Sequence, residues 1–210
     1  MGKLDVQYRV LGLINTNVYF LVNKETKEAL VVDPADSAEY IMKQFELRGY
    51  KLCGILLTHG HFDHIYGAEH LRKLSGAKIY AYKNEADVLA DPFVNRSQVW
   101  ADAYTVKPDV LFEDGQEVEM AGMKFRVLHT PGHTHGSCCY YFYEDDALIA
   151  GDTLFYESYG RTDLTTGNQD AIIHSLRDIL FKLPPQTAVY PGHGDFTDIA
   201  HELDYNPIAE

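Results

Sequence analysis

The sequence predicts a single domain of the α+β class, in which helices cover layered β-sheets. Short apolar segments of strand length alternate with amphipathic segments of helical period along all 210 residues. Hydrophobic residues make up 46% of the chain, which is enough for a sizeable core and argues against intrinsic disorder. No linker or low-complexity tract interrupts the pattern. Strands and helices mixed in this way fold into packed layers, so we expect residues 1–210 to form one domain.

Strands are predicted where short apolar or alternating runs stand between turn residues. The predicted strands are 6–10, 18–22, 29–32, 54–57, 78–81, 118–120, 124–128, 137–143, 147–150 and 187–190.

Three segments predict helices. Asp36 and Glu39 form a D-x-x-E capping box, which indicates a helix that ends near Gly49. Residues 65–74 carry apolar side chains at helical spacing. Asn168 is suited to cap a third helix, which the two prolines after residue 183 would end. Residues 91–116 show no regular period.

The chain is strongly acidic, with 18 Lys and Arg against 31 Asp and Glu and a formal charge of −13. Nucleic acids and anionic membranes bind basic surfaces, so we expect neither as a partner. No apolar run reaches the length of a membrane helix, and no secretory leader opens the chain. Cys53, Cys138 and Cys139 form no disulfide framework and no C-x-x-C motif. We therefore expect a reducing, cytoplasmic location, with the adjacent thiols packed on opposite faces of a strand.

Histidine is the unusual component, with 10 residues, and it gathers where predicted strands end. Four apolar strands run into ligand-type side chains, and strand ends of layered sheets gather functional groups, so we expect one shared site. Imidazole and carboxylate suit divalent metals such as zinc. The expected ligands are His59, His61, Asp63, His64, His133, Asp152 and His193.

Crowding among these ligands predicts two metal ions. Four of them lie within six residues, His59 to His64, which is too close for one tetrahedral ion to use all four. Asp152 is the natural bridge, because a carboxylate offers two oxygens. Gly60, Gly132, Gly151 and Gly192 each adjoin an expected ligand, where a small residue permits close backbone approach.

The pattern His59-x-His61-x-Asp63-His64, with the downstream ligands in order, resembles the metallo-β-lactamase superfamily. Its flanking runs HTPGHTHGS, GDTLF, GRTDL and PGHG resemble those of hydroxyacylglutathione hydrolases, also called glyoxalases II. The resemblance implies a four-layer αββα sandwich and two divalent ions, with zinc expected and iron or manganese as alternatives. It assigns His59, His61 and His133 to one ion, assigns Asp63, His64 and His193 to the other, and places Asp152 and a hydroxide between them.

Three departures bear on function. His135 stands where the family often has proline. Asp152 stands where true β-lactamases of the superfamily commonly have cysteine, which disfavours lactamase activity. The segment after His193 is too short for the C-terminal helical region with which longer glyoxalases II hold glutathione.

The predicted reaction is hydrolysis of an anionic small-molecule thioester such as an S-2-hydroxyacylglutathione. Two ions about 3.5–4 Å apart would lower the pKa of a shared water towards about 7 and polarise the substrate carbonyl. A thiolate leaves readily, since the parent thiol has a pKa of about 8.5. Asp63 and Asp152 are the predicted catalytic carboxylates.

Substrate binding is predicted on the loop after Asp152. The resemblance suggests that Arg161 meets a substrate carboxylate, an interaction that a guanidinium favours. Tyr156 and Tyr159 on the same loop are candidate hydrogen-bonding groups. The alternatives are a salt bridge of Arg161 with Asp163 or Asp152, and plain packing of the two tyrosines.

Other functions remain open at this level. Persulfide dioxygenases resemble the chain in scaffold and in the GRTD run, and their single iron would take His59, His133 and Asp152. A nuclease is disfavoured because the chain has no basic cluster. A non-catalytic metal protein is disfavoured because structural sites are usually closed and mononuclear.

Some remaining candidates are expected to be structural. His129 and His135 are expected to support loops, and His70, His174 and His201 to lie on helices as solvated or packed side chains. Trp100 is expected either in a lid or in the core.

Overall fold

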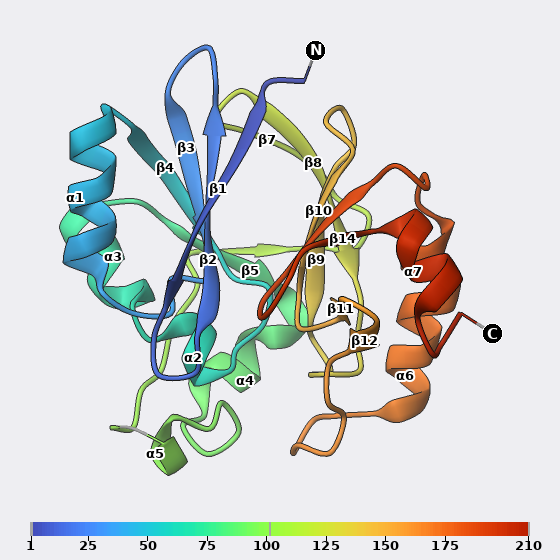
Figure 1. Cartoon of the computed structure of the whole chain (residues 1–210). Coiled ribbons are helices and arrows are strands. Elements are labelled where there is room, and N and C mark those ends of the chain that lie inside the picture. Colours follow the sequence, from blue (N-terminus) through green and yellow to red (C-terminus); the bar gives the residue numbers. More distant parts are fainter. Residues whose placement is uncertain (1, 101, 210) are drawn as a thin grey trace.

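A computed structural model describes residues 2–100 and 102–209 as two six-stranded sheets packed face to face. Helices cover the outer face of each sheet, which gives four layers in the order αββα (Figure 1). The predicted α+β class and the implied sandwich are both confirmed. Among the helices of the described residues, none is long and apolar enough to cross a membrane.

The first sheet has the order β1-β2-β3-β4-β5-β6 and holds the N-terminal half of the chain. β1, β2 and β3 pair antiparallel, and β3 to β6 pair parallel. α1 and α3 lie on the outer face of this sheet. The bounds are β1 Leu4–Leu11, β2 Thr16–Asn23, β3 Glu28–Val32, α1 Ala38–Arg48, β4 Lys51–Leu56, α2 Phe62–Ile65, α3 Ala68–Ser75, β5 Ile79–Tyr82 and β6 Val110–Phe112.

The second sheet has the order β14-β13-β10-β9-β8-β7, with β10 and β13 parallel and the other neighbours antiparallel. α6 and α7 cover its outer face. The bounds are β7 Glu117–Met120, β8 Met123–His129, β9 Cys138–Phe142, β10 Ala147–Gly151, α6 Gln169–His174, β13 Ala188–Pro191, β14 Thr197–Asp198 and α7 Ile199–Tyr205. Between β10 and α6, β11 Leu154–Phe155 and β12 Ser158–Tyr159 pair antiparallel as a separate two-stranded sheet.

Short helices complete the chain. A 3₁₀ turn, Lys83–Glu85, leads into α4, Ala86–Ala90, and α5 spans Ser97–Trp100. After α6 the chain continues through a π-helical turn, Ser175–Ile179, and a 3₁₀ turn, Leu180–Lys182.

The core has three apolar layers, because the central strands are buried on both faces. In β2, Phe20 packs beneath the helices of the first sheet, whereas Tyr19 faces the second sheet. In β9, Cys138 lies between the sheets and Cys139 beneath α6, as predicted for the adjacent thiols. Burial raises the pKa of both thiols, that of Cys139 to about 11, so both stay protonated near neutral pH.

All ten predicted strands coincide with observed strands to within a few residues, but two helix predictions were wrong in detail. Asp36 does not cap α1: its Oδ1 accepts a hydrogen bond from the N–H of Ser37 at 2.5 Å, and Ser37 is the N-cap. The helix predicted over 65–74 is two helices that part at Gly67. The N–H of Gly67 donates to the carbonyl of Pro34 at 2.8 Å, so the chain turns there.

Three further sequence predictions can be compared with the structure. Leu74 is 46% exposed and lies off the buried stripe of α3. The third helix begins as predicted, because the Asn168 side chain accepts a hydrogen bond from the N–H of Ala171 at 2.9 Å. The segment without a period, 91–116, contains α5 and β6.

Candidate metal centre

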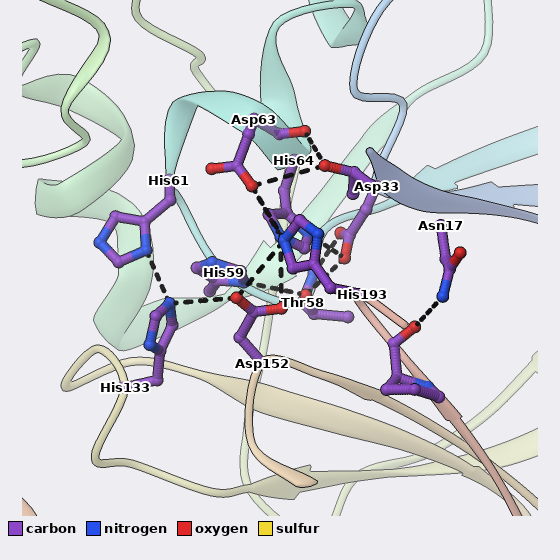
Figure 2. Close-up of polar contacts among 12 residues, drawn as sticks. Asn17, Asp33, Thr58, His59, His61, Asp63, His64, His133, Asp152 and His193 are labelled. Carbon is purple, nitrogen blue, oxygen red and sulfur yellow. Dashed lines mark hydrogen bonds and ion pairs between the residues drawn. The ribbon is translucent and has the colours of Figure 1, made fainter. Parts of the chain in front are cut away.

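The loops that follow the strands bring the predicted ligands together at one edge of the two sheets (Figure 2). Donor atoms of His59, His61 and His133 all lie within 4.8 Å of one another. Donor atoms of a second group lie equally close together: Asp63, His64 and His193. These are the two groups that the resemblance implied.

Asp152 lies between the two groups. Its Oδ1 is 3.3 Å from Nε2 of His64 in the second group. Its Oδ2 is 3.5 Å from Nε2 of His133 and 3.7 Å from Nε2 of His193. One carboxylate therefore reaches both groups, as a bridging ligand must.

Local structure explains how so many ligands fit in one loop. β4 ends at Leu56, and α2 begins at Phe62, so Asp63 and His64 lie in the first turn of a helix. The hydroxyl of Thr16 donates to the backbone carbonyl of Asp63 at 2.9 Å and fixes this turn against β2.

A glycine permits close packing from the opposite side. A Cβ on Gly192 would lie 2.2 Å from Oδ1 of Asp152 and 2.6 Å from Cε1 of His64. Any larger residue would push into the cluster, so the predicted close backbone approach is confirmed at this position.

Asp33 orients two of the rings. Nδ1 of His64 lies 2.9 Å from Oδ2 of Asp33, and a carboxylate can only accept, so Nδ1–H donates. The hydroxyl of Thr58 donates to the same oxygen at 2.6 Å. Because that hydroxyl proton is used, the Thr58 oxygen accepts from Nδ1–H of His59, 3.1 Å away. In the neutral form of both rings the lone pair is on Nε2, which faces the cluster. Burial acts to lower the pKa of His64, but Asp152 and Asp63 raise it well above its usual value, so Nε2 of His64 must lose a proton to bind a metal ion.

Backbone carbonyls orient two further rings in the same way. Nδ1 of His133 donates to the carbonyl of Arg161 at 2.8 Å. Nδ1 of His193 donates to the carbonyl of Asn15 at 3.3 Å. In the neutral form of each ring the lone pair is on Nε2. Nε2 of His193 lies 3.1 Å from Oδ2 of Asp63, and although burial acts to lower the pKa of His193, this contact raises it, so that nitrogen must lose a proton to bind a metal ion.

One ring nitrogen of the cluster lacks a partner that could satisfy it without a cation. Nε2 of His59 is buried and has no hydrogen-bond partner within the described part of the chain. Nδ1 of His61 faces Nε2 of His133 at 2.8 Å. Burial lowers the pKa of His61 to about 3 and that of His133 below its usual value, so both rings are neutral. Nδ1–H of His61 can donate to the lone pair on Nε2 of His133, and a metal ion between the two rings would replace that hydrogen bond.

The carboxylates are ionised. Burial acts to raise the pKa of Asp152, but the neighbouring His64 holds it at about 2. Burial opposes ionisation of Asp63 as well, yet His64 and His193 hold its pKa well below the usual value. Five imidazoles with two carboxylates form a donor set that suits divalent zinc, iron or manganese.

Two buried acids that the sequence analysis did not single out support this centre. Asp33 directly follows the strand predicted over 29–32, so the strand-end signal that identified the ligands was present there too. Glu85 is 1% exposed; its Oε1 accepts from the N–H of Gly60 at 2.6 Å and its Oε2 from the hydroxyl of Thr134 at 2.8 Å. Glu85 thereby joins the loop of His59 and His61 to the loop of His133.

The centre opens into a cleft of about 310 Å³, called here the metal-site cleft. It is lined by ligands together with Ile14, Phe62, Arg96, Trp100, Arg161 and Leu164. Trp100 is 62% exposed, so the core-filling alternative for it was wrong.

Arg161 lines this cleft as predicted, but it is already paired. Its Nε and Nη2 donate to the two carboxylate oxygens of Asp163, each at 2.7 Å. Tyr156 and Tyr159 are not among the residues that line the cleft. Tyr156 stacks on His201 with ring centroids 4.8 Å apart, and the hydroxyl of Tyr159 accepts from Gln169.

The other histidines have supporting roles, as expected. Nε2 of His129 donates to the carbonyl of His135 at 2.9 Å, and Nε2 of His135 lies 2.9 Å from Oδ1 of Asp87. Neither belongs to either metal-binding group.

Two helix-flanked sheets with paired His and Asp groups at their shared edge define a metallo-hydrolase type of protein. The sequence comparison makes this specific. Residues 11–193 match the family model of the metallo-beta-lactamase superfamily, and the chain belongs to this superfamily.

Two relatives illustrate its place there. A probable metallo-hydrolase of Bacillus subtilis, YqgX, is 38% identical over 200 residues, which are 94% of each chain. The hydroxyacylglutathione hydrolase GloC of Haemophilus influenzae is 32% identical over 193 residues, which are 90% of each chain.

Three solved structures share the fold over nearly the whole chain. BLEG-1, described as a B3 metallo-beta-lactamase, has a TM-score of 0.92 at 36% identity and covers 98% of this chain and 99% of its own. TTHA1623 in a di-iron-bound form has a TM-score of 0.85 at 32% identity, with 96% and 98% covered. ETHE1 from Myxococcus xanthus has a TM-score of 0.79 at 30% identity, with 97% and 84% covered.

Proposed function

We propose that this chain is a dinuclear metal-dependent hydrolase of anionic thioesters such as an S-2-hydroxyacylglutathione. The observation that carries the proposal is the complete second group, Asp63, His64 and His193, beside the first group, with Asp152 reaching both. The relative named as a hydroxyacylglutathione hydrolase supports the choice of substrate.

The residues of the cleft favour water as the nucleophile. Among the described residues that line it, none is Ser, Thr, Cys or Lys, and its Asp and His side chains are assigned to the metal-binding groups. When bound, two divalent ions would lower the pKa of a water molecule and polarise the thioester carbonyl. Asp63 and Asp152, both ionised, can accept hydrogen bonds and orient that water. The thiolate can leave without a general acid.

The proposal includes the setting of the reaction. It takes the whole chain as one catalytic domain that binds two ions, zinc first, in the cytoplasm. The three cysteines are free thiols, as a reducing compartment would keep them. A small anionic molecule is the proposed partner, and a chain of net charge −13 is poorly suited to nucleic acid.

A second candidate is a persulfide dioxygenase with one iron held by His59, His133 and Asp152. The likeness to ETHE1 favours it, whereas the neighbour in a di-iron-bound form supports iron as the metal but with two ions. The second group of ligands has no role in such a mononuclear site, but its presence alone does not decide between the two functions. The relative named as a hydroxyacylglutathione hydrolase makes the hydrolase the first choice.

One set of assays on protein loaded separately with zinc and with iron separates these functions. Thiol release from S-lactoylglutathione, with two metal equivalents bound, supports the hydrolase. Oxygen uptake with glutathione persulfide, with one iron bound and no thiol release, would replace it with the dioxygenase. Hydrolysis of nitrocefin tests the activity suggested by the likeness to BLEG-1. Full metal loading with no thioester turnover would refute the proposal.

A further inference from the structure

The metal-site cleft contains an arginine that has no assigned role. Arg96 lines the cleft together with His61, His133 and Asp152, and it is half-buried. Within residues 2–100 and 102–209, no carboxylate lies at ion-pair distance from its guanidinium. The charge of Arg96 does reach Asp163, whose pKa it helps to lower after the larger effect of Arg161. A cation in a cleft with no carboxylate at ion-pair distance is nevertheless available for a ligand.

Hydrogen bonds of its two neighbours hold Arg96 next to the start of α2, the helix that carries Asp63 and His64. Its neighbours Asn95 and Ser97 are both fully buried. The Asn95 side chain donates to the carbonyl of Tyr104 at 2.7 Å and accepts from the N–H of Ser97 at 2.9 Å. The backbone carbonyl of Asn95 accepts from the N–H of Phe62, the first residue of α2, at 2.8 Å. The segment is therefore fastened to the helical turn that carries Asp63.

Arg96 also adopts an uncommon backbone conformation. Its φ of +70° lies in the left-handed region, which residues other than glycine enter rarely. The buried hydrogen bonds on both sides impose this conformation, and such strain is concentrated at ligand-binding positions.

The other arginine of the cleft lacks this availability. Arg161 is held in a two-point salt bridge by Asp163, so its charge is largely neutralised by its own neighbour. The sequence analysis assigned the substrate carboxylate to Arg161. The geometry instead favours Arg96 as the free cation.

We propose that Arg96 binds a carboxylate on the thiol carrier of the substrate and so makes the enzyme selective for anionic thioesters. This rests on the proposed function, because a neutral 2-hydroxyacyl group leaves the thiol carrier as the source of negative charge. The planar guanidinium can bind the carboxylate through two parallel N–H···O hydrogen bonds. Trp100, beside Arg96 on the rim, offers an apolar face to the rest of the carrier.

Binding can be measured without turnover by titrating the metal-loaded protein with S-methylglutathione, a thioether with no thioester bond to hydrolyse. Its diethyl ester, in which both carboxylates are masked, is the matched ligand. We expect the wild type to bind the acid at least about tenfold more tightly than the ester, as loss of a charge-assisted pair implies. Arg96→Gln should abolish that difference, and Arg96→Lys should restore part of it.

Two control variants make the result specific. Arg48→Gln removes an equal charge from a half-buried arginine at the end of α1, outside the cleft, and should bind both ligands as the wild type does. Arg161→Gln should weaken binding of the acid less than about threefold, because Asp163 already occupies that guanidinium. The inference is overturned if Arg96→Gln binds the acid as tightly as the wild type. It is also overturned if both ligands lose affinity equally, or if the wild type binds neither.

The thioester assay keeps the two proposals apart. If the wild type hydrolyses S-lactoylglutathione and Arg96→Gln shows the same KM, the hydrolase stands and the role of Arg96 falls. If the wild type hydrolyses no thioester but binds the acid through Arg96, the carboxylate site stands and the hydrolase falls.

Discussion

Oδ2 of Asp33 lies 2.9 Å from Nδ1 of His64, and through the hydroxyl of Thr58 it also sets the orientation of His59. His59 belongs to the first metal-binding group and His64 to the second. One carboxylate that is not itself in the cleft therefore controls a ring in each group. It links the end of β3 to the loop after β4, where most of the ligands stand.

Asp33→Asn should weaken metal binding by about 10- to 100-fold, the usual effect of losing a hydrogen-bond partner of a metal-binding histidine. The carboxylate accepts three hydrogen bonds, from His64 and from the N–H and hydroxyl of Thr58. An amide has one oxygen, and its NH₂ group would face a donor. Metal equivalents retained against graded chelator, measured by mass spectrometry, check the prediction.

Asp178→Asn is the control. Asp178, in the π-helical turn after α6, pairs with His174 at the end of α6, and both side chains are exposed. The Asp178→Asn variant should retain two metal equivalents up to the same chelator concentration as the wild type does. Equal retention by Asp33→Asn would show that Asp33 does not orient the ligands.

Glu85 predicts a pH dependence of stability. Burial raises the pKa of Glu85 from 4.5 to about 8 in the folded protein. The folded state then binds more protons than the unfolded state between these two values, so this group lowers the free energy of unfolding as pH rises from about 4.5 to about 8. Glu85→Gln removes the titration, and its NH₂ group can donate to the hydroxyl oxygen of Thr134, which reverses the direction of the present hydrogen bond.

The measurement is urea unfolding of both metal-loaded proteins from pH 5 to pH 9. The wild type should lose stability relative to Glu85→Gln by an amount on the order of a few kcal/mol, since one pKa unit corresponds to about 1.4 kcal/mol. Glu119→Gln, on the exposed side of β7, should run parallel to the wild type. A constant difference between wild type and Glu85→Gln at all pH values would contradict the prediction.

Asp163→Asn should lower the KM for an anionic thioester by a few-fold, because it releases the guanidinium of Arg161 into the cleft. The pair is exposed, so the effect should shrink as salt rises. Steady-state kinetics at low and high ionic strength test this. Arg161→Gln combined with Asp163→Asn should return KM towards the wild-type value, and an unchanged KM in the single variant would show that Arg161 is too remote to act.

The predicted ligands lie together because each follows a buried strand, and strand ends are fixed by the core. Their division into two groups was implied by the family resemblance and not by the strand ends. His133 and Asp152 follow β8 and β10, two strands of one sheet, so their convergence follows from the layers. Glu85 and Arg96 could not be found this way. Their roles depend on contacts with Gly60 and Phe62, which are distant in sequence, and the segment of Arg96 has no hydrophobic period.

The break between α2 and α3 was missed for a related reason. The apolar spacing across it is helical, but a tertiary contact interrupts the helix: the N–H of Gly67 donates to the carbonyl of Pro34. A Cβ at Gly67 would lie 2.7 Å from that carbonyl oxygen, so the glycine is required by the neighbouring chain and not by the helix. Helix propensity depends on the local sequence alone, so it cannot indicate a contact with Pro34.

Gly192→Ala should disable the second metal-binding group while the fold survives. The added Cβ would meet Oδ1 of Asp152 at 2.2 Å and Cε1 of His64 at 2.6 Å, so both side chains must move. Such a displacement exceeds the about 0.5 Å tolerance of a catalytic arrangement, and we expect a fall in kcat of about 100-fold or more. Metal analysis should find fewer than two equivalents. Thermal unfolding should remain a single cooperative transition, which would show that the fold survives.

Gly194→Asn is the matched control two residues away. A Cβ there meets no atom within 4 Å, and asparagine tolerates its φ of +73° better than other residues do. It should keep two metal equivalents and wild-type turnover. If both variants lose metal equally, the loop after β13 fails as a whole and the clash at Gly192 is not the cause. If Gly192→Ala keeps both ions and full turnover, then Asp152 and His64 can shift without loss, and a bridging role for Asp152 would be refuted.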